Sequence, residues 1–234
     1  MINSTNPPSI YDPLVNKIIE AQTPTEFFQI DDPSAQILSQ LMIAGFMIMS
    51  YQDNGEDFLI AKIHEHRMAV DPAQIQPGKT VRKKLPHYTI TMDVSFDQVI
   101  DNCISQHGGD WLTPTLIDRV NEIRVNYLEN PGNCGPRPVS FELWLGDVLV
   151  AGEFGILCGS CYTSYSGFTK ISGSGTVQLY ALARFLADHR VCLWDLGMAI
   201  GYKFSLGAQL LDRKTFIQEF RKARLMECDV MIDL

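Results

Sequence analysis

The sequence lacks the features that place a protein in a membrane or in the secretory pathway. Its most apolar segment, ILSQLMIAGFMIMSY, contains Ser39 and Gln40 and is shorter than the ~20 residues that a membrane-spanning helix needs. The chain starts MINSTNPPSIYDPL, with neither a charged nor an apolar leader segment, so no secretory signal is visible. We therefore expect a cytoplasmic protein.

Motifs that hold common cofactors are absent as well. The sequence contains no P-loop, no calcium-binding loop and no dinucleotide-binding glycine pattern. Cys158 and Cys161 form a lone Cys-x-x-Cys pair, and a zinc site needs a second pair or a suitably placed histidine. Without a secretory context, free thiols are favoured over disulfides. We expect neither a metal nor a cofactor.

Positive charge is scarce. The chain has 19 Lys and Arg residues against 27 Asp and Glu residues, and the net charge of −8 excludes a generally basic nucleic-acid coat but not a local basic patch. With 46% hydrophobic and 20% charged residues, the composition is that of a folded protein, and 234 residues can form one large domain or two small ones. Composition alone favours a small-molecule or peptide substrate.

The N-terminal part has the pattern of a small α+β module. Pro and Asp recur through the first ~35 residues, which is typical of an irregular arm. The segment PSAQILSQLMIAGF has the apolar spacing of a helix that ends near Gly45, and MIMSYQDNGEDFLIAKI predicts two strands joined by an Asn-Gly turn. We place the boundary near GKTVRKKLPHY, which predicts a module of residues 1–84 and a catalytic domain of residues 85–234.

The second part is more regular. HYTITMD alternates like a strand, and two helices follow with N-caps at Ser95 and Thr113. VSFELWLGDVLVAGEFGILCG predicts two strands around the turn LGD. A further strand, a loop of small residues, a helix, a buried strand around Asp195 and a last helix complete the order. This order is that of the acetyltransferase-like (GNAT-like) fold, so we predict an α+β or α/β protein with a mixed sheet flanked by helices.

Asp195 stands out because every near neighbour in VCLWDLGM is apolar or Gly. The run is short and rich in aliphatic and aromatic residues, which is typical of a buried strand. A carboxylate in such a place must be paired, protonated or used in the chemistry of a site. One alternative is structural, with Asp195 accepting hydrogen bonds from backbone amides near Gly197 and Gly201.

The segment SFELWLGDVLVAGEFGILCG resembles the leucyl/phenylalanyl-tRNA protein transferase family. The family pattern runs S-hydrophobic-E-hydrophobic-W, then a short turn, then L-V-G-G-hydrophobic-Y-G. The residues on that pattern are Ser140, Glu142, Trp144, Leu149, Val150, Gly152 and Gly155. WDLGMAIGYKFSLGAQLLDRKTF is similar to the family's aspartate strand with its S-L-G-A element, and GKTVRKK is similar to its basic element. The resemblance covers about residues 40–225.

The resemblance implies aminoacyl transfer. The family moves Leu or Phe from the 3′ end of a charged tRNA to the α-amine of a protein that begins with Arg or Lys, which tags that protein for degradation by the N-end rule. The ester bond is already activated, so such an enzyme needs position and polarity more than a nucleophile of its own. We expect a monomer whose donor substrate is aminoacyl-tRNA.

The resemblance also assigns roles to residues. Asp195 would orient the incoming amine, with Glu142 on the facing strand as its catalytic partner, and Trp111 would stack on the terminal adenine. The other candidates for binding the substrate are Phe141, Trp144, Phe154, Ile156, Tyr165 and Ser166, and those for binding tRNA phosphates are Lys79, Arg82, Lys83 and Lys84. The structural alternatives are core packing for the aromatic and apolar residues and a solvated face for the charge run.

The sequence departs from the family at several positions. Gly197 stands where the family has Gln, Met49 stands where it has Trp, and CYTSYSG keeps Tyr165 and Ser166 but loses a Glu and an Arg. The loop KISGSG is close to the phosphate loop of coenzyme A acetyltransferases, in which Gly residues let backbone amides approach a pyrophosphate. A coenzyme A-dependent N-acyltransferase and an inactive binding descendant are therefore the alternatives.

Overall fold

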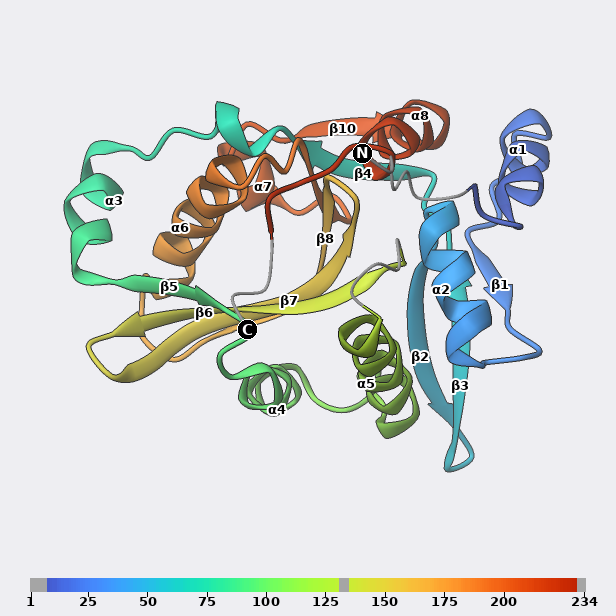
Figure 1. The fold of residues 1–234 in the computed structure, drawn as a ribbon, viewed down its shortest axis with the longest axis horizontal. Helices are drawn as coiled ribbons and strands as arrows, with labels where there is room; N and C mark the ends of the chain where they lie inside the picture. The colour runs from blue at the N-terminus through green and yellow to red at the C-terminus, as the bar shows by residue number, and fades with distance from the viewer. Residues whose placement is uncertain (1–7, 131–134, 231–234) are drawn as a thin grey trace.

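The protein is built around a seven-stranded mixed sheet (Figure 1), and the computed structural model describes residues 8–130 and 135–230. The strands are β4 (His66–Val70), β5 (Thr89–Met92), β6 (Arg137–Leu145), β7 (Val148–Cys158), β8 (Cys161–Thr169), β9 (Leu193–Gly197) and β10 (Gln209–Asp212). Their order is β10-β4-β9-β8-β7-β6-β5. Neighbouring strands are antiparallel except β8 and β9, which run parallel.

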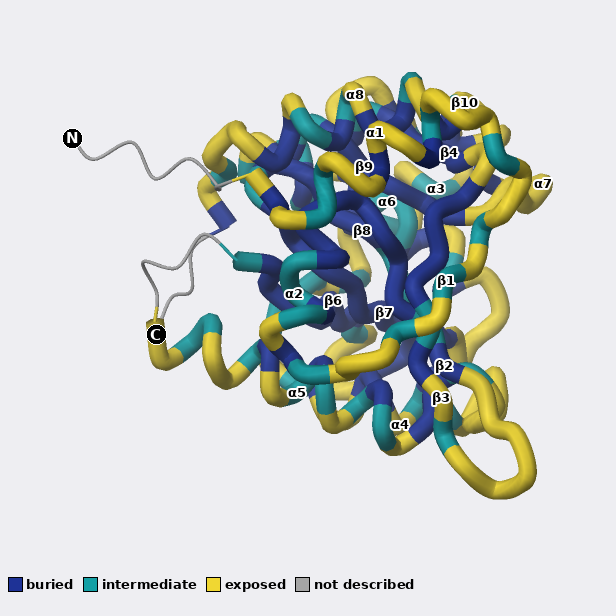
Figure 2. The backbone as a smooth tube through the Cα atoms, turned by 90° about the vertical axis from the view of Figure 1, so that its right-hand side faces the viewer, coloured by how far each residue is buried: buried dark blue, intermediate teal, exposed yellow. Residues whose placement is uncertain are grey.

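Helices cover both faces of this sheet. They are α4 (Phe96–His107), α5 (Pro114–Glu129), α6 (Ser174–Asp188) and α8 (Arg213–Arg224). α6 packs on one face, and α4, α5 and α8 contribute to the hydrophobic core on the other face, so that the central strands lie buried between the layers (Figure 2). The predicted mixed sheet flanked by helices is confirmed. In the described residues no helix is both long and apolar enough to cross a membrane.

A second, three-stranded sheet lies beside the first (Figure 1). Its elements are β1 (Phe27–Gln29), β2 (Met47–Asp53) and β3 (Glu56–Lys62), accompanied by α1 (Asp12–Glu20) and α2 (Ala35–Ala44). Gly45 ends α2 with a φ of 100°, and Asn54 and Gly55 turn the chain between β2 and β3 with φ values of 51° and 84°. The predicted helix end near Gly45 and the predicted Asn-Gly turn are both confirmed. Gly and Asn occur at these positions because they tolerate a positive φ better than other residues do.

The prediction of an irregular arm is wrong for residues 12–29. α1 and β1 lie there, and Val15 and Ile18, three residues apart on one side of α1, are buried in the core. Pro24, Asp31, Asp32 and Pro33 lie on the connections between these elements. Asp12 and Pro13 lie in the first turn of α1, where a missing N–H costs nothing.

Long-range contacts join the N-terminal segment to the rest. β4 precedes the boundary predicted at residue 84, yet it pairs with β9 and β10 in the seven-stranded sheet. Arg213, the first residue of α8, donates hydrogen bonds to the carbonyl oxygens of Thr23, Thr25 and Ile63 at 2.7, 3.0 and 3.1 Å. The short helices α3 (Lys79–Lys84) and α7 (Gly201–Ser205) and the 3-10 turns Pro72–Gln74 and Leu85–His87 lie on connections.

Helix starts follow the capping residues in the sequence. The Thr113 hydroxyl accepts a hydrogen bond from the Leu116 amide at 3.4 Å, and the Asp212 carboxylate accepts one from the Thr215 amide at 2.8 Å. These bonds satisfy amides that the helix itself leaves unpaired. Ser95 occupies the N-cap position of α4 as predicted, but its side chain makes no capping bond; its amide donates to the Glu142 carboxylate at 3.3 Å instead.

Five of the six cysteines lie in the described residues, and all five are free thiols. They are Cys103, Cys158, Cys161, Cys192 and Cys228. Burial raises the pKa of the Cys103 and Cys158 thiols to about 12, so both are protonated at neutral pH. The sixth cysteine, Cys134, for which a free thiol is also expected, lies outside the described residues.

Gly155 lies in β7 where β8 approaches closely. A Cβ atom at this position would lie 2.2 Å from the Thr163 carbonyl oxygen and 2.7 Å from the Tyr162 ring. We expect Gly155→Ala to lower the free energy of unfolding by about 1–3 kcal/mol, because the extra methyl group forces the two strands apart. Chemical denaturation measures this change. Gly109→Ala is the matched control, since nothing lies within 4 Å of its Cβ position; equal losses would contradict the close approach.

Candidate active site

A large cavity opens where the parallel strands β8 and β9 part. Their pairing covers only Cys161 to Thr163 on β8 and Leu193 to Asp195 on β9, and β8 continues to Thr169 without its partner. The gap forms a cavity of about 980 Å³, lined by the free half of β8, the residues after β9 and the start of α6. This volume is that of a site for a small molecule or the end of a larger one.

Three of the predicted site residues line this cavity. They are Trp111, Tyr165 and Ser166. The Tyr165 hydroxyl accepts a hydrogen bond from the Ile48 amide at 3.1 Å, which holds the ring between β2 and β8. Met49, which stands in place of the family's Trp, lines the cavity as well. The wall is therefore aromatic and apolar over much of its area.

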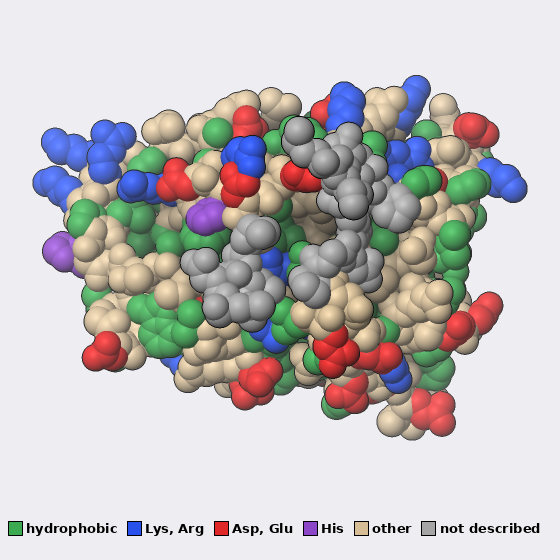
Figure 3. Space-filling model, in the orientation of Figure 1, with side chains coloured by type: hydrophobic (Ala, Val, Ile, Leu, Met, Phe, Trp, Pro, Cys, Tyr) green, Lys and Arg blue, Asp and Glu red, His purple; other side chains and the backbone are tan. Residues whose placement is uncertain are grey.

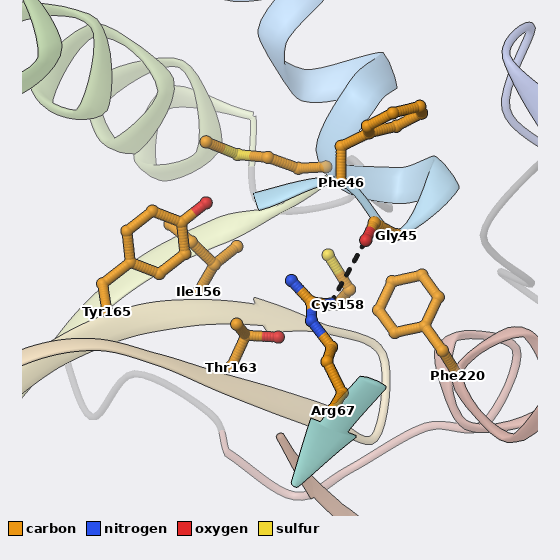
Figure 4. A pocket seen from close by; sticks show the side chains of 9 residues that line it. Gly45, Phe46, Arg67, Ile156, Cys158, Thr163, Tyr165 and Phe220 are labelled. Carbon is orange, nitrogen blue, oxygen red and sulfur yellow. Dashed lines mark hydrogen bonds between the residues drawn. The ribbon is translucent and has the colours of Figure 1, made fainter. Parts of the chain in front are cut away.

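The other predicted substrate-binding residues lie away from this cavity. Phe141 packs edge-on against Tyr162, with ring centroids 5.1 Å apart, and Phe154 is fully buried against Tyr165. Trp144 donates from its indole nitrogen to the Thr91 hydroxyl at 2.8 Å. Ile156 borders a separate cavity of about 10 Å³, which is too small for an acyl chain (Figure 4). Phe141 and Phe154 belong to the hydrophobic core, as the structural alternative stated.

Asp195 is fully buried and paired. Its carboxylate lies 3.1 Å from Arg67 Nη1, and it accepts hydrogen bonds from the Thr163 hydroxyl at 3.0 Å and the Gly197 amide at 2.9 Å. Arg67 also donates to the Gly45 carbonyl oxygen at 3.2 Å (Figure 4). Gly197 is among the residues that line the large cavity, and Asp195 is not. Asp195 therefore bonds to Arg67 and to a neighbouring amide at the edge of the site.

His64 lines the cavity and also contacts Arg67 of this ion pair. Arg67 Nε donates a hydrogen bond to His64 Nδ1 at 3.1 Å, so the ring proton of neutral His64 is on Nε2. Burial, as the largest cause, and the nearby charges of Arg67 and Lys62 together lower the pKa of His64 to about 2. His64 is therefore a neutral hydrogen-bond donor at any physiological pH.

The structure does not bring Glu142 to Asp195. β7 and β8 lie between β6, which carries Glu142, and β9. The buried Glu142 carboxylate accepts hydrogen bonds from the Thr91 and Ser140 hydroxyls, each at 2.6 Å. With the Ser95 amide, these bonds tie β5 and the start of α4 to β6. The expected partnership of the two carboxylates is wrong.

A second buried carboxylate, Glu153 on β7, lines the cavity instead. Its Oε1 accepts hydrogen bonds from the Tyr162 hydroxyl at 3.0 Å and the Ser164 hydroxyl at 2.6 Å, and its Oε2 accepts one from Gln178 Nε2 at 3.1 Å. Burial raises the pKa of Glu153 to about 7, although these hydroxyls and the charge of Lys203 act in the opposite direction.

Sequence reasoning missed Glu153, although a signal was present. Glu153 lies in the apolar run VLVAGEFGIL, as Asp195 does in VCLWDLGM, and it stands where the family pattern has a hydrophobic residue. His64 and Lys203 also line the cavity. His64 gave a weaker signal because charged residues surround it in AKIHEHR, and Lys203 is a single cation in AIGYKFSLG.

The predicted phosphate-binding residues lie together on α3. Lys79, Arg82, Lys83 and Lys84 are all exposed. Figure 3 shows their side chains gathered over this helix at the left of the molecule. α3 packs against α6, whose first turns line the cavity. In residues 8–130 and 135–230 no group of three or more His, Cys, Asp or Glu side chains is arranged to hold a metal ion.

Comparison with known proteins agrees with the motif resemblance. The model of the family described as leucyl/phenylalanyl-tRNA protein transferase matches residues 69–221. Proteins of that name from Teredinibacter turnerae and Azoarcus sp. are each 32% identical, over 156 and 155 residues, or 64% of this chain. The matched parts span 57% and 62% of those relatives. Among solved structures, FemX is 8% identical with a TM-score of 0.46, covering 86% of this chain and 75% of that one.

Removing Asp195 tests the buried ion pair. We expect Asp195→Ala to lower the free energy of unfolding by about 3–5 kcal/mol, because Arg67 is left buried without its partner. Urea denaturation with a fluorescence readout measures this. Asp188→Ala is the control, since the Arg184 and Asp188 side chains are 83% and 65% exposed and such a pair contributes about 0–1 kcal/mol. A loss below about 1 kcal/mol in Asp195→Ala would contradict the pairing.

Burial of Glu153 predicts a pH-dependent stability. Its pKa is about 7 in the folded protein against an ordinary 4.5, so the protonated form favours folding below pH 4.5 and that advantage is lost as the pH rises through 7. The unfolding free energy of the wild type minus that of Glu153→Gln should therefore fall by about 3 kcal/mol as the pH rises from below 4.5 to above 7. Denaturant titrations at several pH values measure it. Glu129 is exposed, so the unfolding free energy of the wild type minus that of Glu129→Gln should not change with pH.

Proposed function

The chain belongs to the leucyl/phenylalanyl-tRNA protein transferase family, and we propose that it transfers leucine or phenylalanine from an aminoacyl-tRNA to the α-amine of a protein that begins with Arg or Lys. The observation that carries this proposal is the cavity between the parting ends of β8 and β9, with Trp111 on its wall. An aromatic side chain there offers a stacking surface for the terminal adenine of the donor. This use of parting parallel strands is the acetyltransferase-like arrangement that we propose for the fold.

The chemistry that we assign to this site needs position and polarity. The amine attacks an ester that is already activated, and negative charge grows on the carbonyl oxygen as the tetrahedral intermediate forms. We assign His64 the role of hydrogen-bond donor to that oxygen, because its Nδ1 accepts from Arg67 and its pKa of about 2 keeps the ring neutral. A neutral donor in a buried site stabilises the oxyanion without the cost of burying an extra charge.

Asp195 acts through Arg67 in this scheme. The carboxylate holds the guanidinium, whose Nε in turn holds His64 Nδ1, and this chain of contacts runs from β9 through β4 to the cavity wall. Asp195 is thus a positioning residue, and the missing Gln at Gly197 is not needed for this step. In many catalytic sites a carboxylate bonds a histidine directly and fixes its tautomer and direction; in this scheme Arg67 lies between the two and passes on that constraint.

The basic face of α3 fits the phosphates of the donor. Four exposed cations on one short helix can neutralise phosphates of an acceptor stem, although the net charge of the protein is −8. α3 packs against α6 beside the cavity, so a tRNA lying on α3 has a route for its 3′ end into the site. The family match does not favour the coenzyme A alternative.

A donor comparison tests the proposed function. We expect label from radioactive Leu-tRNA and Phe-tRNA to enter a peptide with N-terminal Arg, and label from acetyl-coenzyme A not to enter it. The same peptide with an acetylated N-terminus lacks the attacking amine and is the control for transfer to side chains. Labelling is followed by scintillation counting after the peptide has been separated.

The alternatives predict other outcomes of this comparison. Label from acetyl-coenzyme A alone would overturn the proposal in favour of the N-acyltransferase that the KISGSG loop suggested. Transfer from no donor, with a folded protein that binds tRNA, would overturn it in favour of an inactive binding descendant.

A further inference from the structure

The Glu153 carboxylate has one acceptor position that the described protein groups leave open. An ionised carboxylate can accept about four hydrogen bonds. Tyr162 and Ser164 donate to Oε1, and Gln178 donates to Oε2. Oε2 therefore has capacity for a further donor, and Glu153 and Gln178 both contribute to the wall of the cavity.

Glu153 also lacks a cationic partner among the described residues. None of the ion pairs within 4.0 Å in residues 8–130 and 135–230 involves it, and its three partners are neutral. The charge of Lys203 reaches Glu153, but its ammonium donates to the carbonyl oxygens of Leu196 and Met198. A carboxylate that is 5% exposed is unfavourable without a cation, and a ligand in the cavity can supply one.

Part of the wall of this cavity is apolar. Met47, Met49, Met198 and Tyr202 line the same cavity, and Lys203 is the cation in its lining. A ligand that matches such a wall has a long aliphatic stem and a cationic head, because the stem packs against methionine and aromatic groups while the head reaches the carboxylate. Lysine and arginine side chains have this form.

We propose that Glu153, together with Gln178, binds the ammonium or guanidinium group of a lysine or arginine side chain in the substrate. The inference rests on the proposed aminoacyl transfer, which offers two sources of that side chain: the first residue of the acceptor protein, or the amino acid on the tRNA. A guanidinium donates several hydrogen bonds in a plane, one of which the open position on Oε2 accepts.

Measuring the binding of small ligands in the absence of any transfer reaction tests the site at Glu153 directly. Argininamide and citrullinamide have nearly the same shape and differ in side-chain charge, and NMR chemical-shift titration measures their affinity for the protein. We expect the wild type to bind argininamide about ten- to a hundredfold more tightly than citrullinamide, and Glu153→Gln to bind the two equally. Glu153→Asp should keep part of the preference. Equal binding of both ligands by the wild type would overturn the proposal.

Transfer assays then identify the source. If the acceptor supplies the cation, peptides with N-terminal Arg are labelled about ten- to a hundredfold faster than citrulline peptides, and Glu153→Gln removes that difference. If the donor supplies it, Lys-tRNA or Arg-tRNA is preferred to Leu-tRNA, and Glu153→Gln removes that preference instead. Glu129→Gln is the control variant, and circular dichroism checks that each variant is folded.

The two failures are distinguishable. Suppose that Leu-tRNA donates, and that Glu153→Gln changes neither the preference for Arg over citrulline peptides nor the preference among the tRNA donors. This result overturns the inference about Glu153 and keeps the proposed function. Failure of every aminoacyl-tRNA to donate overturns the proposed function, and the amide titration still decides whether Glu153 binds a cationic side chain.

Discussion

The buried ion pair between Arg67 and Asp195 sits where the seven-stranded sheet opens. Thr163 and Asp195 form the last pair between β8 and β9, and Arg67 reaches Asp195 from β4 on the far side of β9. A buried pair adds little net stability over apolar packing, but breaking it leaves a costly charge. Its contribution is therefore positional. It fixes β4, β9 and the end of α2 relative to one another, and the cavity opens at a defined place.

The two buried carboxylates near this opening, Asp195 and Glu153, differ in the partners that balance their negative charge. Asp195 has a guanidinium, a hydroxyl and an amide of the protein as partners. Glu153 has only neutral donors, and burial raises its pKa to about 7. Asp195 thus costs the folded protein little, whereas an ionised Glu153 costs stability in the absence of a ligand. Such a local cost is typical of sites in which selection favours binding or chemistry over stability.

Local sequence patterns predicted the elements whose contacts are local. Thr113 caps α5, Gly45 ends α2 and the Asn-Gly turn joins β2 to β3, because each depends on residues within a few positions. The patterns missed β4 and β10, which are short and pair with strands far away in the chain. They also missed α1, where Asp12 and Pro13 in the first turn concealed a helix with two buried residues.

The sequence by itself determined the family pattern, most of the helices and strands, and the presence of a carboxylate inside a buried strand. Tertiary structure alone decided which buried carboxylate faces the cavity. Glu153 and Phe154 are neighbours in β7, and successive side chains of a strand point to opposite faces of a sheet. Which of those faces is open depends on how α6 and the core helices pack and on where β9 leaves β8. These contacts join residues far apart in the chain, and no local pattern contains them.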